Sequence, residues 1–277
     1  GAIVSPVPSP FTSFPGIFQQ QQAPLFGVNK LPPDTTGDIG PNHYVQAVNT
    51  SYAVYDRSGN LLAGPIPFAD TTLPGIPTAG LFNGATYDPG DAPGVLCDDY
   101  NSGDPVVLYD ELADRWLISQ FAFVNSSTPP YKQCVAVSTT GDPLGSWYLY
   151  EFELSTSPTM FPDYPKIGVW NDAYYLSANA FDLTQSPADA VGGFAVALER
   201  DVMLAGGASP RMVSVGPPAT NADRLFGLLP ADLDGPAPPP GTPGVFLVLE
   251  DTNFGAPADG LRPWAATVDW SGSPSLT

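Results

Sequence analysis

The feature that most constrains the fold is a pattern that occurs four times along the chain, in which an aspartate precedes a strand-like segment led by an aromatic residue. The aspartates are spaced by 66, 59 and 69 positions, and the aromatic residues by 72, 59 and 71. A repeat of about 60 to 70 residues is long enough for one four-stranded β-propeller blade with its loops. The aspartates are Asp38, Asp104, Asp163 and Asp232, the aromatic residues are Tyr44, Trp116, Tyr175 and Phe246, and the polar residues that follow them are Asn49, Gln120, Asn179 and Glu250.

The second and third repeats can each be divided into four antiparallel strands. In the second repeat the strands are separated by turns that contain Gly, Pro, Asp or Asn, which favour chain reversals. We therefore predict an all-β fold, a β-propeller of four-stranded antiparallel blades, in preference to a sandwich, which lacks this period. The predicted strands are 105–110, 115–123, 133–140 and 146–154 in the second repeat, and 166–170, 173–181, 192–198 and 211–216 in the third.

The two ends of the chain differ from the repeats. Residues 1–33 are rich in Pro, Ser and Gln, and we predict an N-terminal arm there, followed by a propeller domain at 34–277. Only 45 residues follow Asp232, so the last blade is short. We expect either four to five blades, closed with a strand from the arm, or a fragment of a longer propeller. Residues 198–205 alone have a helix-like apolar spacing.

The charge of the chain excludes two classes of partner. The sequence has 9 Lys and Arg against 28 Asp and Glu, which gives a formal net charge of −19. Nucleic acids and anionic membranes are both bound through clustered Lys and Arg. No apolar segment approaches the roughly 20 residues that span a bilayer. We therefore expect neither nucleic-acid binding nor membrane insertion.

The two cysteines indicate the compartment. Cys97 and Cys134 are 37 positions apart, which fits neither a CxxC redox motif nor a zinc motif. We predict a disulfide between them, with two buried free thiols as the alternative. Because disulfides persist mainly in exported proteins, and because the chain starts at Gly1 as after removal of a signal peptide or trimming, we expect a secreted, extracellular protein.

Carboxylates are the main reactive groups in this composition. The single histidine, His43, excludes a His-rich metal site; it is predicted to pack at a strand start or, with Tyr44, to contact a ligand. If the repeats are blades, Asp38, Asp104 and Asp163 open successive inner strands and converge at the mouth of the central channel. A carboxylate pair about 5 to 9.5 Å apart is what glycoside hydrolysis requires. The alternative is that these aspartates cap turns.

A loop beside Cys97 carries oxygen ligands of the kind that calcium prefers. Its candidate ligands are Asp98, Asp99, Asn101 and Asp104. The loop lacks the glutamate that ends a typical calcium-binding loop. A solvated acidic turn is therefore the alternative to a calcium site.

Four segments carry a resemblance to a known group of proteins. They are PPDTTGDIGPNHYVQAVNTSYAVYDRSGN at 32–60, GDPVVLYDELADRWLISQFAF at 103–123, QCVAVSTTGDPLGSWYLYEF at 133–152 and DYPKIGVWNDAYYLSANAF at 163–181. On these segments the chain resembles a family of secreted, largely uncharacterised bacterial proteins that look propeller-like. The resemblance covers most of residues 32–270, and members of the family are usually longer than this chain. It implies a secreted propeller, and it implies no particular activity.

Two functional hypotheses follow. The first is a non-catalytic extracellular propeller with a role in binding, adhesion or surface assembly. Its partner would be a glycan or a protein at a cell surface, or a second copy of the chain recruited through the N-terminal arm, whose strand could extend a neighbouring sheet. The alternative is a carbohydrate-active hydrolase that uses Asp38, Asp104 and Asp163.

Overall fold

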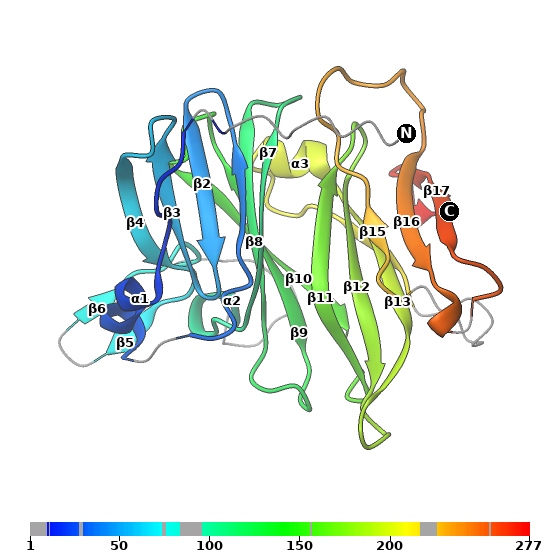
Figure 1. The fold of residues 1–277 in the computed structure, drawn as a ribbon. Helices are drawn as coiled ribbons and strands as arrows, with labels where there is room; N and C mark the ends of the chain where they lie inside the picture. Colours follow the sequence, from blue (N-terminus) through cyan, green and yellow to red (C-terminus); the bar gives the residue numbers. More distant parts are fainter. Residues whose placement is uncertain are drawn as a thin grey trace, which may run out of the picture.

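The chain folds into a series of antiparallel sheets, each built from consecutive strands (Figure 1). The computed structural model describes residues 10, 12–27, 30–73, 76–83, 96–155, 157–216, 226–254 and 256–277. The first sheet contains β1 (Thr36–Ile39), β2 (His43–Val48), β3 (Ser51–Asp56) and β4 (Leu61–Pro67) in that order.

The second and third sheets confirm the strands predicted from the sequence. The second contains β7 (Gly103–Asp110), β8 (Arg115–Ala122), β9 (Tyr131–Ser138) and β10 (Trp147–Ser155), and the third contains β11 (Met160–Val169), β12 (Tyr174–Asp182), β13 (Asp189–Leu198) and β14 (Met212–Val215). In both sheets the spatial order of the strands is their order in the chain. Consecutive hairpins within one sheet are the construction of a propeller blade.

The fourth sheet is smaller, as the short last repeat predicted. It contains β15 (Leu229–Pro230), β16 (Gly244–Glu250) and β17 (Gly260–Ala266). Two further hairpins are formed by β5 (Thr71–Leu73) with β6 (Ile76–Thr78) and by β18 (Val268–Asp269) with β19 (Ser275–Leu276).

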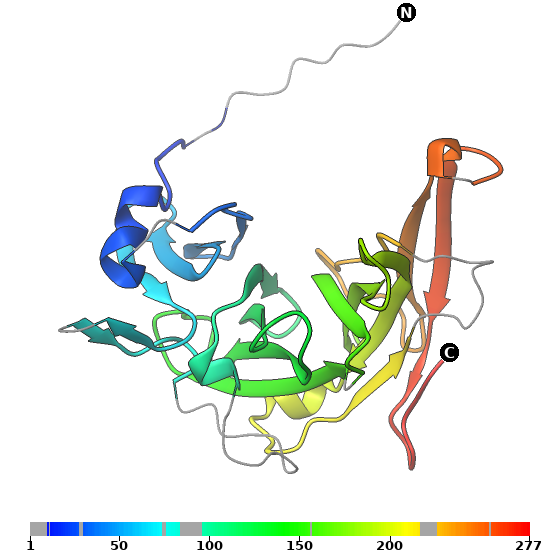
Figure 2. The same cartoon turned by 90° about the horizontal axis from the view of Figure 1, so that it is seen from below.

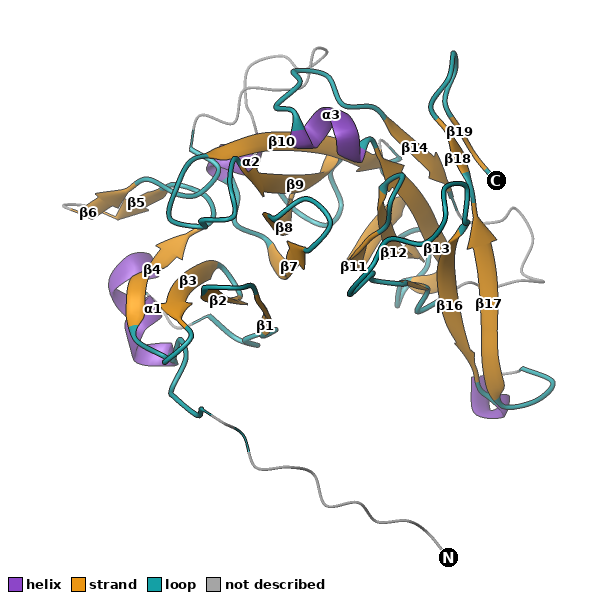
Figure 3. Cartoon of the chain, turned by 90° about the horizontal axis from the view of Figure 1, so that it is seen from above, coloured by secondary structure: helices purple, strands orange, loops and turns teal. Residues whose placement is uncertain are grey.

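The sheets are arranged as blades around an open arc. The first strands of neighbouring sheets, β1, β7, β11 and β15, pack against one another in that sequence. Figure 2 shows the first and fourth sheets at the two ends of the arc, and Figure 3 shows β1, β7 and β11 on its inner side, with β4 and β10 farther out. The fold is therefore that of a β-propeller, as predicted, with the first strand of each blade innermost.

The hydrophobic core lies between the blades. Every residue of β9, and all of β8 except its first, is buried, because the first and third sheets cover the two faces of the second. Burial of one large apolar side chain contributes about 1.5 to 3 kcal/mol, so these contacts fix the angle between blades. Each pair of neighbouring sheets shares a cluster, represented by Val54 and Ile118, by Leu117 and Leu176, and by Tyr175 and Phe246.

The helices are short. Besides α2 (Leu96–Asp99) and the 3-10 helix η2 (Thr252–Phe254), the structure contains α3 (Arg200–Leu204), which lies inside the segment that the sequence predicted as helical. Within the described residues, no helix is long and apolar enough to cross a membrane.

The segment predicted as an N-terminal arm contains a helix that the sequence did not reveal, α1 (Gln19–Phe26). It packs on the first blade: the Phe14 ring contacts the ring of Tyr55, and Gln22 donates from Nε2 to the carbonyl of Asn49 at 2.6 Å. In the described part of the segment, residues 12–27 therefore pack against the first blade.

The disulfide between Cys97 and Cys134 is present, as predicted. It joins α2 to β9, and both cysteines are fully buried. Beside it, Glu151 accepts a hydrogen bond from the Cys97 amide at 3.0 Å and lies 3.4 Å from the Lys132 ammonium. The bridge thus ties the loop that precedes the second blade to the middle of its sheet.

Candidate active site

Three aspartates lie at the leading, N-terminal ends of the inner strands. Asp34 precedes β1 by two residues, Asp104 is the second residue of β7, and Asp163 is the fourth residue of β11. All three are partly buried. Lys166, which follows Asp163 on the same strand, acts electrostatically on all of them. We refer to Asp34, Asp104, Asp163 and Lys166 as the leading-end cluster.

The backbone of this cluster is unusual. Asp34 has a φ of 37° and Asp104 a φ of 48°, and Tyr164, next to Asp163, has a φ of 55°. This left-handed region costs a non-glycine residue about 1 kcal/mol or more. Asp104 and Asp163 also lie at β-bulges, between Gly103 and Val106 in β7 and between Asp163 and Lys166 in β11. Bulges redirect side chains and are frequent beside functional sites.

Burial and neighbouring charges act strongly on Asp104. Its desolvation, followed by the charges of Asp163 and Asp34, raises its pKa to about 6, against the opposing effect of Lys166. The carboxyl of Asp104 also forms a hydrogen bond with that of Asp34, which favours the protonated form of Asp104. A hydrogen bond between two carboxyls needs one proton, which Asp104 carries in its protonated form. We refer to Asp34 and Asp104 as the proton-sharing pair.

Asp163 and Lys166 complete the electrostatics. Burial raises the pKa of Asp163, while the Tyr164 amide and the Lys166 ammonium oppose this rise. Burial lowers the pKa of Lys166, although the three carboxylates act in the opposite direction. Lys166 Nζ also lies 3.4 Å from the centroid of the Tyr164 ring, and Tyr164 is 52% exposed. The cluster therefore combines a proton-sharing pair, a third carboxylate, an ammonium and an exposed aromatic ring.

Asp38 does not belong to this cluster, contrary to the prediction that it would join Asp104 and Asp163. Its carboxylate accepts a hydrogen bond at 2.7 Å from the amide of Tyr109. Tyr109 lies five residues beyond Asp104 on β7, which corresponds to roughly 16 Å along an extended strand. The charges that act on Asp38 are those of Asp234 and Glu111.

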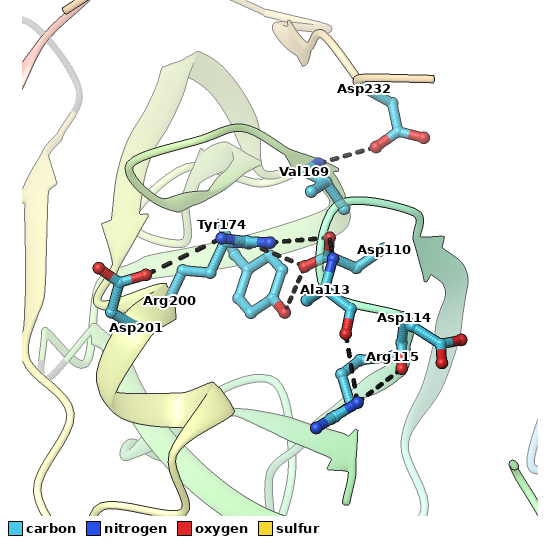
Figure 4. A network of polar contacts seen from close by, with 9 residues as sticks. All are labelled: Asp110, Ala113, Asp114, Arg115, Val169, Tyr174, Arg200, Asp201 and Asp232. Atoms are coloured by element: carbon cyan, nitrogen blue, oxygen red, sulfur yellow. Dashed lines mark hydrogen bonds and ion pairs between the residues drawn. The ribbon is translucent and has the colours of Figure 1, made fainter. Parts of the chain in front are cut away.

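Asp38 instead belongs to a second group, at the trailing ends of the inner strands. Asp232 makes the same kind of contact between the fourth blade and the third, because its carboxylate accepts a hydrogen bond at 2.8 Å from the amide of Val169 (Figure 4). Partial desolvation and the charges of Asp234 and Asp38 raise the pKa of Asp232 to about 6. Much of its surface is exposed, so solvent screens this effect. Asp38 and Asp232 thus link neighbouring blades.

Asp34 was not identified from the sequence as a site residue, although the sequence carries a signal for it. Asp104 and Asp163 each precede the aromatic leader of their repeat by 12 positions, Asp34 precedes its leader by 10, and Asp38 precedes the same residue by only 6. The missing two positions have a structural cause. The first blade has no bulge at this place, and its first turn has three residues where those of the next two blades have four.

His43 and Tyr44 lie away from the leading-end cluster. His43 starts β2, and its Nε2 is 3.9 Å from Asp142 in the turn between β9 and β10. Tyr44 pairs with Ile39 and packs its ring against Phe14. Both residues are thus on the trailing side of the first blade, and ligand binding by them stays a prediction.

The residues proposed for calcium are divided between different structures. Asp98 and Asp99 are in α2, Asn101 donates to the carbonyl of Thr50 at 2.8 Å, and Asp104 belongs to the leading-end cluster. Among the described residues, no group of three or more His, Cys, Asp or Glu side chains is arranged to hold a metal ion. Calcium binding at this loop stays a prediction.

A pocket of about 250 Å³ lies elsewhere, between the first blade and the turn at residues 143–147. Its lining includes Tyr52, Ile66, Leu144 and Trp147, and no member of the leading-end cluster. Its lining offers no carboxylate or amine, so it lacks the acid and base groups that the leading-end cluster has.

Comparisons with known proteins assign no family to this chain. No protein-family model and no curated protein matches the sequence. Solved structures that align with the chain include a GH43 β-1,3-galactosidase, with a TM-score of 0.39, 13% identity and coverage of 91% of this chain and 46% of that one. An exo-β-1,3-galactanase from Clostridium thermocellum has a TM-score of 0.32 and 10% identity, with coverage of 90% and 62%.

A GH43 endo-arabinanase from Bacillus licheniformis aligns with a TM-score of 0.30 and 11% identity, over 88% of this chain and 96% of that one. The chain thus spans 46% and 62% of the lengths of the first two structures. At these identities and scores the likeness assigns no activity to this chain.

Proposed function

We propose that this protein hydrolyses glycosidic bonds and that the leading-end cluster is its active site. The observation that carries the proposal is the proton-sharing pair of Asp34 and Asp104 beside a third carboxylate, Asp163, and the ammonium of Lys166. Glycoside hydrolysis needs one carboxyl that holds a proton near neutral pH and one that is ionised. The site therefore favours the enzyme over the non-catalytic propeller that the sequence placed first.

Asp104 and Asp163 have different roles in the proposed reaction. Asp104, whose pKa is raised to about 6, donates its proton to the glycosidic oxygen as the bond from that oxygen to the anomeric carbon breaks. Asp163 either takes a proton from the attacking water or bonds to the anomeric carbon, and water then releases the sugar. The Lys166 ammonium opposes the rise in the pKa of Asp163, which favours the ionised form that either role needs.

The test compares four aspartate variants on a panel of polysaccharides, with the release of reducing ends as the measurement. We expect Asp104→Asn and Asp163→Asn to lower the rate on the order of 100-fold or more, the usual effect of losing a general acid or base. Asp38→Asn is the matched control, because Asp38 is also a partly buried inner-strand carboxylate. It should retain the parent rate within about 3-fold. The fourth variant, Asp34→Asn, tests the proton-sharing pair and should slow the reaction.

Two results would contradict the proposal. One is a parent protein that binds polysaccharides and releases no reducing ends from any of them, which would favour the non-catalytic glycan-binding role. The other is an equal loss in Asp38→Asn and Asp104→Asn. Where activity is found, the anomer of the first product, read by proton NMR, decides whether Asp163 acts as base or as nucleophile.

We also propose that the protein is exported, so that its substrate or partner is an extracellular glycan. The Cys97–Cys134 disulfide supports an oxidising compartment. Fractionation of the producing cells, with alkylation and mass measurement of the two cysteines, tests this. Recovery of the protein in the cytoplasm with both thiols free would contradict it.

A further inference from the structure

Asn49, the residue that follows β2, has a side chain whose polar atoms are all engaged in the leading-end cluster. Its Nδ2 donates to the carbonyl of Pro32 at 3.0 Å and to Oδ2 of Asp34. Its Oδ1 accepts from the amide of Asp104 at 2.9 Å. One amide group therefore binds both members of the proton-sharing pair, the carboxylate of one and the backbone of the other.

The position of Asn49 itself is fixed from several sides. Its backbone amide donates to the carbonyl of Pro33 at 2.7 Å, and its backbone carbonyl accepts from the side chain of Gln22. Gly103 leaves room for the side chain: a Cβ at Gly103 would lie 2.8 Å from Oδ1 of Asn49, and Gly103 has a φ of 104°. The surrounding backbone thus holds the side-chain amide of Asn49 in one place.

The corresponding asparagine of the third blade, Asn179, makes only part of the contacts that Asn49 makes. Asp163 pairs with Asn179 across β11 and β12, and the register of β1 and β2, extended by two residues, puts Asp34 opposite Asn49. Asn179 uses Oδ1 to accept from the amide of Gly227 at 2.8 Å, which ties its blade to the chain that leads into the next. Asn49 makes the equivalent bond to Asp104 and in addition donates to a carboxylate.

Only a primary amide of this length can both accept from the Asp104 backbone amide and donate to the Asp34 carboxylate. Aspartate in its place could accept from the Asp104 amide but could not donate to Asp34, and it would add a like charge. Alanine could do neither. The same nitrogen would carry the sugar if the Asn49 to Ser51 sequon were glycosylated, so that modification would break the network.

We propose that Asn49 is the positioning residue of the site, which holds Asp34 against Asp104 so that the two carboxyls act as one proton-sharing pair. Its role in catalysis rests on the proposed function. The holding of the pair does not, and it can be measured without a substrate.

The experiment follows the carboxyl carbon signals of the aspartates by NMR while the pH is changed, in the full chain and in two variants. In Asn49→Ala, release of Asp34 removes a neighbour that favours the protonated form of Asp104, so the titration midpoint of Asp104 should fall by about half a pH unit or more. The isosteric Asn49→Asp also releases Asp34 but brings a negative charge that favours the protonated form of Asp104, so its midpoint should lie above that of Asn49→Ala.

Asn101→Ala is the matched control. Asn101 joins the same two segments as Asn49, through its bond to the carbonyl of Thr50, without a bond to either carboxyl of the pair. The midpoint of Asp104 should stay within about 0.2 pH units in this variant, which a general loosening of the loop would not allow.

Each outcome bears on a different claim. Equal midpoints in the parent and both folded Asn49 variants would overturn the positioning role. The two expected shifts in a protein that hydrolyses no polysaccharide would retain the positioning role and overturn the proposed function. If both hold, Asn49→Ala should lower kcat about 10-fold or more with KM within about 3-fold, and the pH profile should move with the NMR midpoint. If Asn49→Ala does not fold, Asn49→Ser takes its place with the same expected fall, because a serine hydroxyl is too short to reach Asp34 and adds no charge.

Discussion

Arg200, the first residue of α3, binds Asp110, the last residue of β7, through two hydrogen bonds of 2.8 Å each (Figure 4). The Asp110 carboxylate also accepts from the Tyr174 hydroxyl at 2.9 Å. The side chain of Asp110 is completely buried and that of Arg200 is 7% exposed. This pair joins the second blade to the third at the end of β7 opposite to Asp104. It thereby helps to fix the inner strands that carry Asp104 and Asp163.

Breaking this pair should destabilise the fold strongly. Asp110→Ala leaves the buried Arg200 guanidinium without its carboxylate, and Arg200→Ala leaves the buried Asp110 carboxylate without its guanidinium. We expect each to lower the free energy of unfolding by about 3 to 5 kcal/mol, measured by urea denaturation. The double variant should cost less than the sum, because neither charge is then left unpaired.

Arg211→Ala is the control for that prediction. Arg211 also binds a carboxylate, that of Glu199, and its side chain is 39% exposed. Solvent screens such a pair, so the loss should be about 1 kcal/mol or less. A similar loss in Arg200→Ala and Arg211→Ala would mean that the buried pair does not hold the blades together.

Much of the fold could be predicted because the two central blades are covered on both sides. Their strands are long, apolar and separated by turn residues, so all eight were found. The helix α1 was not predictable from its sequence, since QQQQAPLF has no apolar face and the segment is held by contacts such as that of Gln22 with the Asn49 carbonyl. Such contacts are formed only in the folded chain.

The site was predictable in part, because two of its aspartates repeat in a fixed frame. Asp104 and Asp163 stand 12 positions before an aromatic residue. The first blade lacks the bulge and has a shorter turn, so a search for an aspartate close to Tyr44 selects Asp38. A shift of four residues along a strand, roughly 13 Å, exchanges the leading ends of the inner strands for their trailing ends. The cross-strand amide Asn49 marks the correct partner, Asp34, once the register is known.

Removal of the disulfide should lower stability through the unfolded state. The bridge between Cys97 and Cys134 closes a loop of 37 positions, for which chain entropy predicts about 4 kcal/mol. We expect the Cys97→Ala, Cys134→Ala double variant to unfold at a markedly lower urea concentration than the parent. An unchanged midpoint would mean that the bridge adds nothing to the sheet contacts around it.

The stability of the fold should depend on the protonation of Asp104. Its pKa is about 6 in the folded protein against an ordinary value of 3.8, so the folded state keeps a proton that the unfolded chain has lost. The resulting stabilisation is complete below about pH 4 and disappears as the pH rises through about 6. One pH unit corresponds to about 1.4 kcal/mol, so the upper bound is about 3 kcal/mol, and solvent screening of the partly exposed Asp104 makes the effect smaller.

Urea unfolding of the parent and of Asp104→Asn at pH 4 and pH 7 measures this effect. The free energy of unfolding of the parent, relative to that of the variant, should decrease from pH 4 to pH 7. Asp182→Asn is the comparison with the opposite sign, because hydrogen bonds from Thr184 lower the pKa of Asp182; its stabilising effect is present at both of these pH values and is lost only as the pH falls below about 4. A constant difference between the parent and Asp104→Asn would show that Asp104 is not perturbed by folding.

Lys166 should set the pH range in which the cluster works. Its ammonium lowers the pKa of Asp104 and of Asp163. Lys166→Met keeps most of the side-chain volume and removes the charge, so both carboxyls should titrate at higher pH than in the parent, and Asp104 above about 6. The carboxyl carbon signals measure this directly, and the pH optimum for release of reducing ends should move upward with them.

Lys30→Met is the control for Lys166, because it changes the net charge by the same amount. Lys30 lies 5.5 Å from the ring of Phe26 at the end of α1, and it does not figure among the charges that act on Asp104 or Asp163. Its loss should leave both midpoints in place. If the two lysine variants moved the carboxyl titrations equally, the effect would be that of net charge, and the local role of Lys166 would be wrong. If Lys166→Met alone moves them, the ammonium is part of the same electrostatic unit as the three aspartates, and the activity profile of that variant then tells whether the unit is also catalytic.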